Sequence, residues 1–247
     1  MTDQWISLRR FTQARIALGR AGHALPTEAL LDFQLAHAQA RDAAHLPWDI
    51  ESFAEQVRDI GAQALILETP VADRSEYLRR PDLGRILTEE SRTRLRDLNA
   101  TAQPDLALIV SNGLSSTAVM RHGIALLQEM LGGLRQRHYS IAPVCLVANG
   151  RVALLDDIGS ALAARMAIII VGERPGLSSP DSLGIYLTYA PQPGNSDAQR
   201  NCISNIRPPE GLAYREAAAK LLHLVGEAMA RCISGVALKD ETVRTIE

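Results

Sequence analysis

The stretch that decides the fold is Met166-Ala167-Ile168-Ile169-Ile170-Val171-Gly172-Glu173-Arg174-Pro175-Gly176-Leu177. Its first part is a continuous apolar run, which is typical of a strand buried on both faces of a sheet. Its second part is a loop that holds a carboxylate, a guanidinium, a proline and two glycines. Because ligands of open α/β sheets bind at the carboxyl ends of strands, this pattern predicts a binding edge at Glu173 and Arg174. An ordinary surface ion pair between these two residues is the alternative interpretation.

Apolar segments of two kinds surround this strand. Short continuous runs predict further strands at residues 64–67, 106–110, 143–147 and 185–189. Apolar residues at three- and four-residue steps predict helices over residues 27–38, 50–60, 83–97, 115–134, 158–165 and 212–234. Strands that alternate with helices indicate an α/β fold, with a helical N-terminal region followed by a Rossmann-like, mostly parallel sheet with helices on both faces.

Turn and cap residues set the expected boundaries. Ser115 or Ser116 is expected to cap the helix that follows residues 106–110. Asn149-Gly150 is a strong hairpin signal, so residues 151–155 are expected to return as a strand. Residues 191–211 are rich in Pro, Gly and Asn and are expected to be irregular. Gly235 is the expected stop of the last helix.

The N-terminal region, residues 1–100, is expected to be mainly helical and to precede an α/β region at residues 101–247, with the boundary near residues 99–105. Within it, the spacing of Leu31, Leu35 and Ala38 predicts one buried helix face. Between Asp3 and Glu28 the chain has four arginines and no acidic residue: Arg9, Arg10, Arg15 and Arg20. A basic helix face, an organelle-targeting segment and an arm that docks onto a partner subunit are the three interpretations.

Composition excludes several classes of protein. The 247 residues are 47% hydrophobic and 22% charged, an ordinary balance for a globular domain. The formal net charge of −2 argues against a general nucleic-acid-binding protein. No apolar run approaches the roughly 18 residues of a membrane helix, so no membrane contact is expected. Three widely spaced cysteines without a Cys-x-x-Cys pair argue against a disulfide framework or a zinc site, and favour a reduced cytoplasmic setting.

The common catalytic motifs are absent. There is no Gly-x-Gly, Gly-Lys-Ser/Thr, Gly-x-Ser-x-Gly or His-Glu-x-x-His sequence, which excludes their nucleotide, hydrolase and metalloprotease sites. The six histidines are scattered and are interpreted as surface or interface residues. The remaining polar candidates are Ser111-Asn112-Gly113, Glu173-Arg174 and residues 201–206, where Cys202 has the alternative role of a small buried hydrophobe.

Six blocks of sequence carry a resemblance to a known family. They span residues 8–22 and the segments Tyr77-Leu78-Arg79-Arg80-Pro81-Asp82-Leu83-Gly84-Arg85, Ser111-Asn112-Gly113-Leu114-Ser115, Gly150-Arg151-Val152, Val171 to Leu177, and Cys202-Ile203-Ser204-Asn205-Ile206. In this order they resemble the small (light) subunit of ethanolamine ammonia-lyase. Six ordered blocks across nearly the whole chain are far more specific than any single motif.

The resemblance implies a radical lyase that uses adenosylcobalamin to convert ethanolamine to acetaldehyde and ammonia. It implies that substrate and radical lie in a TIM barrel formed by a large partner subunit, and that this chain covers the cobalamin from the other side of a hetero-oligomer. The cofactor then carries the chemistry. The chain is accordingly expected to be inactive alone, to hold no catalytic residue and no metal ligand, and to work in the cytoplasm, in some bacteria inside a microcompartment.

Carried over residue by residue, the family's cobalamin contacts fall on Val152, Glu173 and Cys202. The corrin rim carries primary amides, for which the Glu173 carboxylate and the Val152 carbonyl are acceptors, while Cys202 offers a small polarizable contact. No histidine has Asp two positions earlier, the motif with which some cobalamin enzymes replace the cofactor's own base. Base-on adenosylcobalamin, without a cobalt ligand from this chain, is therefore expected.

One function of a different class stays open from the residues alone. An independent α/β module for a nucleotide or another anion would bind its ligand at the N-terminus of the helix after residues 111–116.

Overall fold

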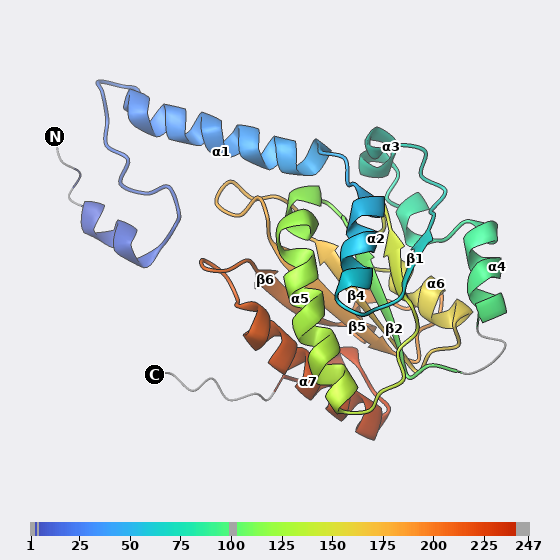
Figure 1. The fold of residues 1–247 in the computed structure, drawn as a ribbon. Coiled ribbons are helices and arrows are strands. Elements are labelled where there is room, and N and C mark those ends of the chain that lie inside the picture. Colours follow the sequence, from blue (N-terminus) through green and yellow to red (C-terminus); the bar gives the residue numbers. More distant parts are fainter. Residues whose placement is uncertain (1–2, 4, 99–102, 241–247) are drawn as a thin grey trace.

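One sheet of six strands, in the order β1-β3-β2-β4-β5-β6, forms the centre of the protein (Figure 1). The computed structural model describes residues 3, 5–98 and 103–240. The strands are β1 (Ala64–Leu67), β2 (Leu106–Ser111), β3 (Val144–Val147), β4 (Met166–Gly172), β5 (Leu183–Tyr189) and β6 (Asn201–Ile206). The first four pair in parallel, whereas β5 pairs antiparallel with β4, and β6 with β5. The predicted α/β fold with a mostly parallel sheet is confirmed.

Helices cover both faces of this sheet. The α-helices of the described residues are α1 (Thr27–His45), α2 (Ile50–Asp59), α3 (Arg74–Arg79), α4 (Glu89–Leu98), α5 (Ser116–Gln136), α6 (Leu154–Ala161) and α7 (Tyr214–Arg231). Helices α2, α5 and α7 pack into one core, and α4 and α6 into the other. Because side chains alternate along a strand, Leu108 of β2 lies in the first core and Ile109 in the second.

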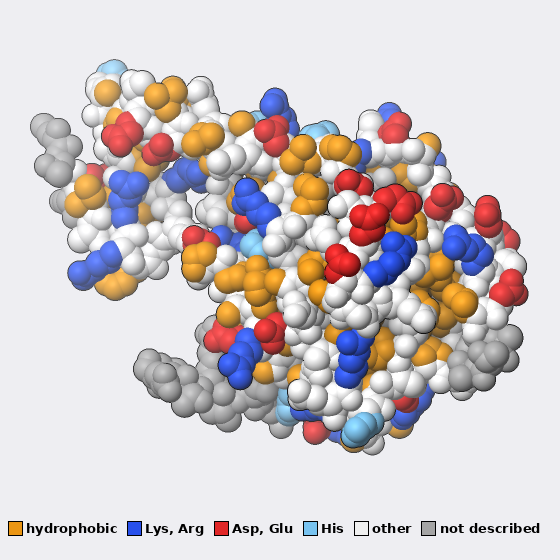
Figure 2. Space-filling view, viewed as in Figure 1, with side chains coloured by type: hydrophobic (Ala, Val, Ile, Leu, Met, Phe, Trp, Pro, Cys, Tyr) orange, Lys and Arg blue, Asp and Glu red, His pale blue; other side chains and the backbone are white. Residues whose placement is uncertain are grey.

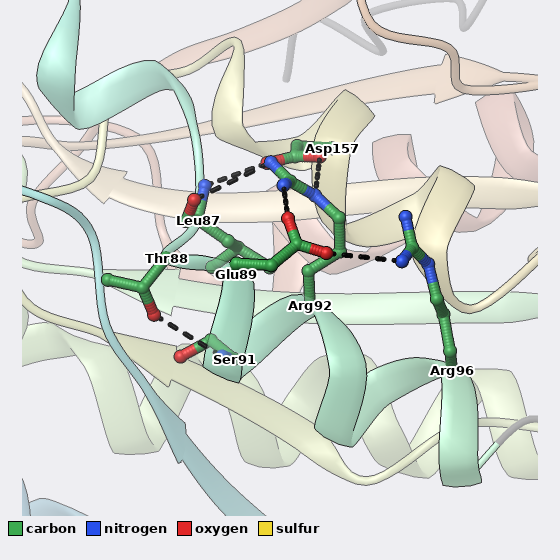
Figure 3. A network of polar contacts seen from close by, with 7 residues as sticks. All are labelled: Leu87, Thr88, Glu89, Ser91, Arg92, Arg96 and Asp157. Carbon is green, nitrogen blue, oxygen red and sulfur yellow. Dashed lines mark hydrogen bonds and ion pairs between the residues drawn. The ribbon is translucent and has the colours of Figure 1, made fainter.

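Asp157 of α6 fixes the position of α4 (Figure 3). Its carboxylate accepts hydrogen bonds from Nε and Nη2 of Arg92, at 3.1 and 2.8 Å, and from the backbone N–H of Leu87 at 2.7 Å. The hydrogen bond to Asp157 is also the largest cause that raises the pKa of Arg92. Such two-pronged, charge-assisted contacts fix direction as well as distance. Residues 83–98 are therefore held firmly against α6.

Gly150 is the meeting point of three segments at the carboxyl end of β3. Its N–H donates to Ser111 Oγ at 2.9 Å, and its carbonyl accepts a hydrogen bond from the Tyr77 hydroxyl at 3.1 Å. A Cβ added here would lie 2.8 Å from Leu154 Cδ2 and 2.9 Å from Ser111 Oγ. Only glycine lets the three segments approach this closely.

The predicted hairpin at Asn149-Gly150 is wrong. Asn149 does adopt a turn conformation with φ of +58°, but the chain then enters α6 at Leu154 instead of returning as a strand. The reason is that β3 already pairs with β1 on one side and with β2 on the other, so it has no free edge for a returning strand. The predicted helix at residues 158–165 accordingly begins four residues earlier.

Three other boundaries differ from the expectations. Residues 191–211 contain the edge strand β6, in which only Ile203 and Ile206 are buried, so no continuous apolar run announces it. Helix α7 ends at Arg231 with Cys232 in the left-handed conformation (φ +56°), ahead of Gly235. The single helix expected over residues 83–97 is divided into the short 3-10 turn η2 (Leu83–Arg85) and α4, because the Leu87 N–H is bound to Asp157.

Residues 5–46 form an arm that extends from the body of the protein, with α1 as its rod and the 3-10 turn η1 (Ile6–Phe11) near its far end (Figure 1). The predicted buried face of α1 is wrong, since Leu31 and Leu35 are 58% and 60% exposed. The buried residues of α1 are Ala36 and Ala43. The two leucines thus form an apolar stripe on α1 that no other part of the described chain covers.

The predicted division of the chain near residues 99–105 stays a prediction, because residues 99–102 lie outside the described part. Strand β1, which precedes that point, pairs with β3 in the same sheet. None of the helices in the described part is long and apolar enough to span a bilayer.

Two glycine substitutions test this packing. Gly132, an exposed residue of α5 with nothing near its missing Cβ, should gain about 0.5–1 kcal/mol of stability on change to Ala, since the change removes the entropic cost of a helical glycine. Gly150→Ala should lose about 1–3 kcal/mol by overpacking. Urea unfolding of the full chain, followed by circular dichroism, measures both. Equal effects of the two substitutions would show that Gly150 is not a tight packing point.

Candidate functional site

The structure brings the three predicted site residues to one side of the sheet. Val152 and Cys202 line the same surface pocket of about 590 Å³, together with Tyr186. Tyr186 of β5 lies opposite Cys202 of β6 in the strand register. Glu173 follows β4 and is outside the lining of this pocket, but its Oε1 lies so close to β5 that a Cβ at Gly184 would come within 2.9 Å of it. Three segments far apart in the sequence therefore meet around Tyr186.

The Glu173 carboxylate is held in a fixed position by its neighbours. Ser204 donates to Oε1 and Ser182 to Oε2, both at 2.5 Å, and the Asn205 N–H lies 3.3 Å from Oε2. A carboxylate has about four acceptor positions, so about one is left for a ligand. The exposed neighbour Arg174 forms no ion pair with it. The alternative of a Glu173–Arg174 surface pair is therefore wrong.

Val152 lies in the turn that leads into α6 and is half-buried. Its side chain packs against the second core, and its carbonyl already accepts the N–H of Leu155 at 3.1 Å. Since a carbonyl has two lone pairs, one acceptor position remains. What Val152 can offer a ligand is this position and an apolar surface.

Cys202 and Tyr186 form the floor of the pocket. Cys202 is an exposed residue of β6, and partial burial of its thiol raises the thiol's pKa, with a smaller contribution of the same sign from Glu173. Burial also raises the pKa of the Tyr186 phenol, and the neighbouring Cys202 adds to this shift. Both groups are thus uncharged near neutral pH, and this floor suits an apolar or hydrogen-bonding ligand better than a cation.

The loop at residues 111–116, the alternative anion site, serves the protein's own packing. Ser115 caps α5 by accepting the Ala118 N–H at 3.1 Å, as expected for one of the two candidate caps, and donates to the Pro180 carbonyl. The Asn112 side chain accepts the Asn149 N–H at 2.7 Å and donates to Ser116. All four polar residues of the loop are buried: Ser111, Asn112, Ser115 and Ser116. An anion would have to displace these bonds to bind here.

The chain matches the family described as ethanolamine ammonia-lyase light chain over residues 2–239. It belongs to this family. Relatives described as ethanolamine ammonia-lyase small subunit include one from Azotobacter vinelandii (strain DJ), 56% identical over 97% of this chain and 89% of that protein. Another, from Pseudomonas fluorescens (strain SBW25), is 54% identical over 99% of this chain and 89% of its own length. One from Pseudomonas putida (strain F1) is 55% identical over 97% of this chain and 88% of its own length. The resemblance stated from the six sequence blocks is thereby confirmed.

The residues around Tyr186 fit the rim of a corrin, which has amide donors, amide acceptors and apolar edges. Glu173 and Val152 each retain an acceptor position, and Val152 and Tyr186 supply apolar surface. In the part of the chain that the structure describes, no group of three or more His, Cys, Asp or Glu residues could hold a metal ion. Contact of Val152, Glu173 and Cys202 with a corrin stays a prediction.

Two kinds of residue at this pocket were missed by sequence reasoning. Tyr186 was assigned only to a strand, although its alternation with Ile185 and Leu187 marks it as facing the opposite side. Arg85 and Arg151, which also line the pocket, come together through tertiary contacts that no local pattern announces. His122, interpreted as a surface or interface residue, is buried and bonded to Tyr214 and Asp181, on the other side of the sheet.

The pKa of Cys202 gives a test of this geometry. At pH 8 iodoacetamide should alkylate Cys202 more slowly than an ordinary exposed thiol, because a raised pKa leaves less thiolate. Glu173→Gln removes a negative charge that raises this pKa, so alkylation should become severalfold faster. Glu129→Gln, the same change at an exposed position of α5, should have no effect. Peptide mass spectrometry of the full chain measures the rates; identical rates in the two variants would place Glu173 away from Cys202.

Proposed function

We propose that this chain is the subunit of ethanolamine ammonia-lyase that binds and covers adenosylcobalamin, while a large subunit holds the substrate. The whole enzyme converts ethanolamine to acetaldehyde and ammonia. The observation that carries the proposal is the meeting of Val152, Glu173 and Cys202, from three distant segments, around Tyr186. The family implies cobalamin contacts at these three positions, and their convergence supports them as one surface.

Each residue has a defined role in this proposal. When bound, adenosylcobalamin supplies the radical chemistry, and the protein supplies position and environment. Glu173 accepts an N–H from a primary amide of the corrin rim, and its two serine donors keep the carboxylate from rotating. Val152 and Cys202 support the edge of the ring. The cofactor stays base-on, and no residue of this chain is catalytic or binds cobalt.

The large subunit, a TIM barrel in the family, is the proposed partner of the N-terminal arm. Ten of the fifteen exposed large hydrophobic residues in the described part lie on residues 5–46. Four of the five arginines of the arm have no ion-pair partner among the described residues: Arg9, Arg10, Arg15 and Arg20. Figure 2 shows orange and blue side chains side by side on the arm. Apolar patches rimmed by unpaired charges mark protein–protein contacts, so a partner with apolar and acidic surface fits.

The proposed setting of the hetero-oligomer is the cytoplasm, in some bacteria enclosed in a microcompartment. The three cysteines are free, which fits a reducing compartment. Subcellular fractionation separates the enclosed from the dispersed state.

Glu173→Ala tests the cofactor role in the complex reconstituted with the large subunit. Loss of one charge-assisted hydrogen bond should weaken cobalamin binding roughly tenfold. Subunit assembly should be unchanged, because Glu173 bonds only to serines and backbone of its own chain. Arg174→Ala, at the exposed neighbouring position, is the matched control and should leave affinity intact. Equilibrium dialysis against cobalamin gives the affinity, and gel filtration reports assembly.

The same preparations test the division of labour. The chain alone should turn over no ethanolamine, whereas the complex should. Turnover by the isolated chain, or equal cobalamin affinity of Glu173→Ala and the parent complex, would contradict the proposed role.

The arm is tested by Leu31→Ser combined with Leu35→Ser. Both leucines are more than half exposed, so the chain should keep its fold, but the dissociation constant for the large subunit should rise at least about tenfold. Val236→Ser, at a residue 78% exposed and outside the arm, is the control. Surface plasmon resonance measures the dissociation constant of both variants for the large subunit. An unchanged constant in the double variant would contradict docking of the arm through Leu31 and Leu35.

A further inference from the structure

Two of the sequence blocks that carry the family resemblance meet beside the pocket. The segment from Tyr77 to Arg85 packs on the segment from Gly150 to Val152. The Arg151 N–H donates to the Gly84 carbonyl at 2.7 Å. Gly84 is buried, and a Cβ there would lie 2.7 Å from the Asn149 carbonyl oxygen and 3.1 Å from Arg151 Cγ. This contact places Arg85 next to Arg151 and Val152.

The Arg151 guanidinium is fixed in orientation but not fully bonded. It lies 4.2 Å from the ring centre of Tyr77, which also contacts Arg74 at 4.8 Å. Its Nη2 donates to the Tyr77 carbonyl at 3.0 Å, while its Nε is buried and has no partner. The Arg151 Nε–H is thus a donor available to a ligand, and it costs free energy as long as it is buried without a partner.

Arg85 adds a second charge to the same pocket. Its side chain is exposed and has no hydrogen bond or ion pair among the described residues, while its backbone N–H donates to the Asp82 carbonyl at 3.2 Å. The third guanidinium of the lining, that of Arg200, is neutralised by Asp156 and Asp197. The guanidinium groups of Arg85 and Arg151 are thus the two in this lining without an ion pair among the described residues, and they lie beside the apolar surface of Val152 and Tyr186. Asp197, the carboxylate that also lines the pocket, is paired with Arg200.

We propose that Arg85 and Arg151 bind the phosphodiester of the cobalamin nucleotide loop. This inference rests on the proposed function. Cobalamin has one phosphate, in the loop that leaves the corrin on the side opposite to the cobalt–carbon bond. A chain that covers this side meets the loop, whereas the reactive side faces the large subunit. A phosphodiester carries one negative charge on two free oxygens, which matches two guanidinium groups, and the attached base suits the apolar wall.

The test compares two corrinoids on the assembled complex. Cyanocobalamin has the loop, and aquacyanocobinamide lacks the phosphodiester and base. Arg85→Gln should lower cyanocobalamin affinity about tenfold and leave cobinamide affinity unchanged, because it removes one charge-assisted contact to the phosphodiester. Arg85→Lys should restore part of the loss. Arg58→Gln, at an exposed arginine of α2 on the other side of the sheet, is the matched control.

The Arg85 side chain has no hydrogen bond or ion pair to lose among the described residues, so its substitution separates binding from folding; Arg151→Lys serves as the second variant. Equal affinity of the Arg85→Gln and parent complexes for cyanocobalamin would overturn the inference and leave the proposed function standing. Parent complexes that bind neither corrinoid would overturn both. Inorganic phosphate is a third probe. If phosphate binds the parent complex but not Arg85→Gln, while the ratio of cyanocobalamin to cobinamide affinity is the same in both, the pocket binds a free phosphate ester. That result would overturn the inference.

Discussion

The site depends on the close approach of three segments at Gly150. The N–H and carbonyl of this residue are bonded to Ser111 and Tyr77, and its missing side chain makes room for Leu154. The backbone of the next two residues, Arg151 and Val152, follows directly from this contact, and Tyr77 also holds the Arg151 side chain. The pocket wall is thus set by a buried backbone hydrogen-bond network and not by the exposed loop itself, which is how a rigid scaffold positions a binding surface.

Two polar groups of the site, Glu173 and Arg151, are each held by neighbouring residues and each keep a hydrogen-bonding position for a ligand. Glu173 is held by two serine hydroxyls and keeps about one free acceptor position, and Arg151 is held by Tyr77 and keeps a free donor. Neither is neutralised by a partner of opposite charge. Groups held in this way lose little side-chain entropy on binding, so more of each contact contributes to affinity. Such an arrangement fits the proposed role of positioning a large cofactor.

Local sequence patterns predicted the parts of the fold that pack against the cores of this chain. The continuous apolar run of β4 was found because the strand packs into both cores, and the periodic faces of α2 and α5 were found because each helix packs one face into the first core. Strand β6 was missed because one of its faces is open, and the leucines of α1 were misplaced because the same stripe suits an internal core or another subunit. The position of Glu173 after an apolar strand marked it as a candidate, and the family resemblance supplied its expected cobalamin role, whereas Arg85 and Arg151 come together only through the Gly84–Arg151 contact.

The most direct measurement of the central claim is a cryo-electron microscopy structure of the complex with its large subunit and bound cobalamin. The account predicts corrin density against Val152, Glu173 and Cys202, with the nucleotide loop in the pocket between Arg85 and Arg151 and the opposite face of the corrin toward the large subunit. Corrin density that is enclosed by the large subunit alone, or that contacts this chain away from Tyr186, would contradict it.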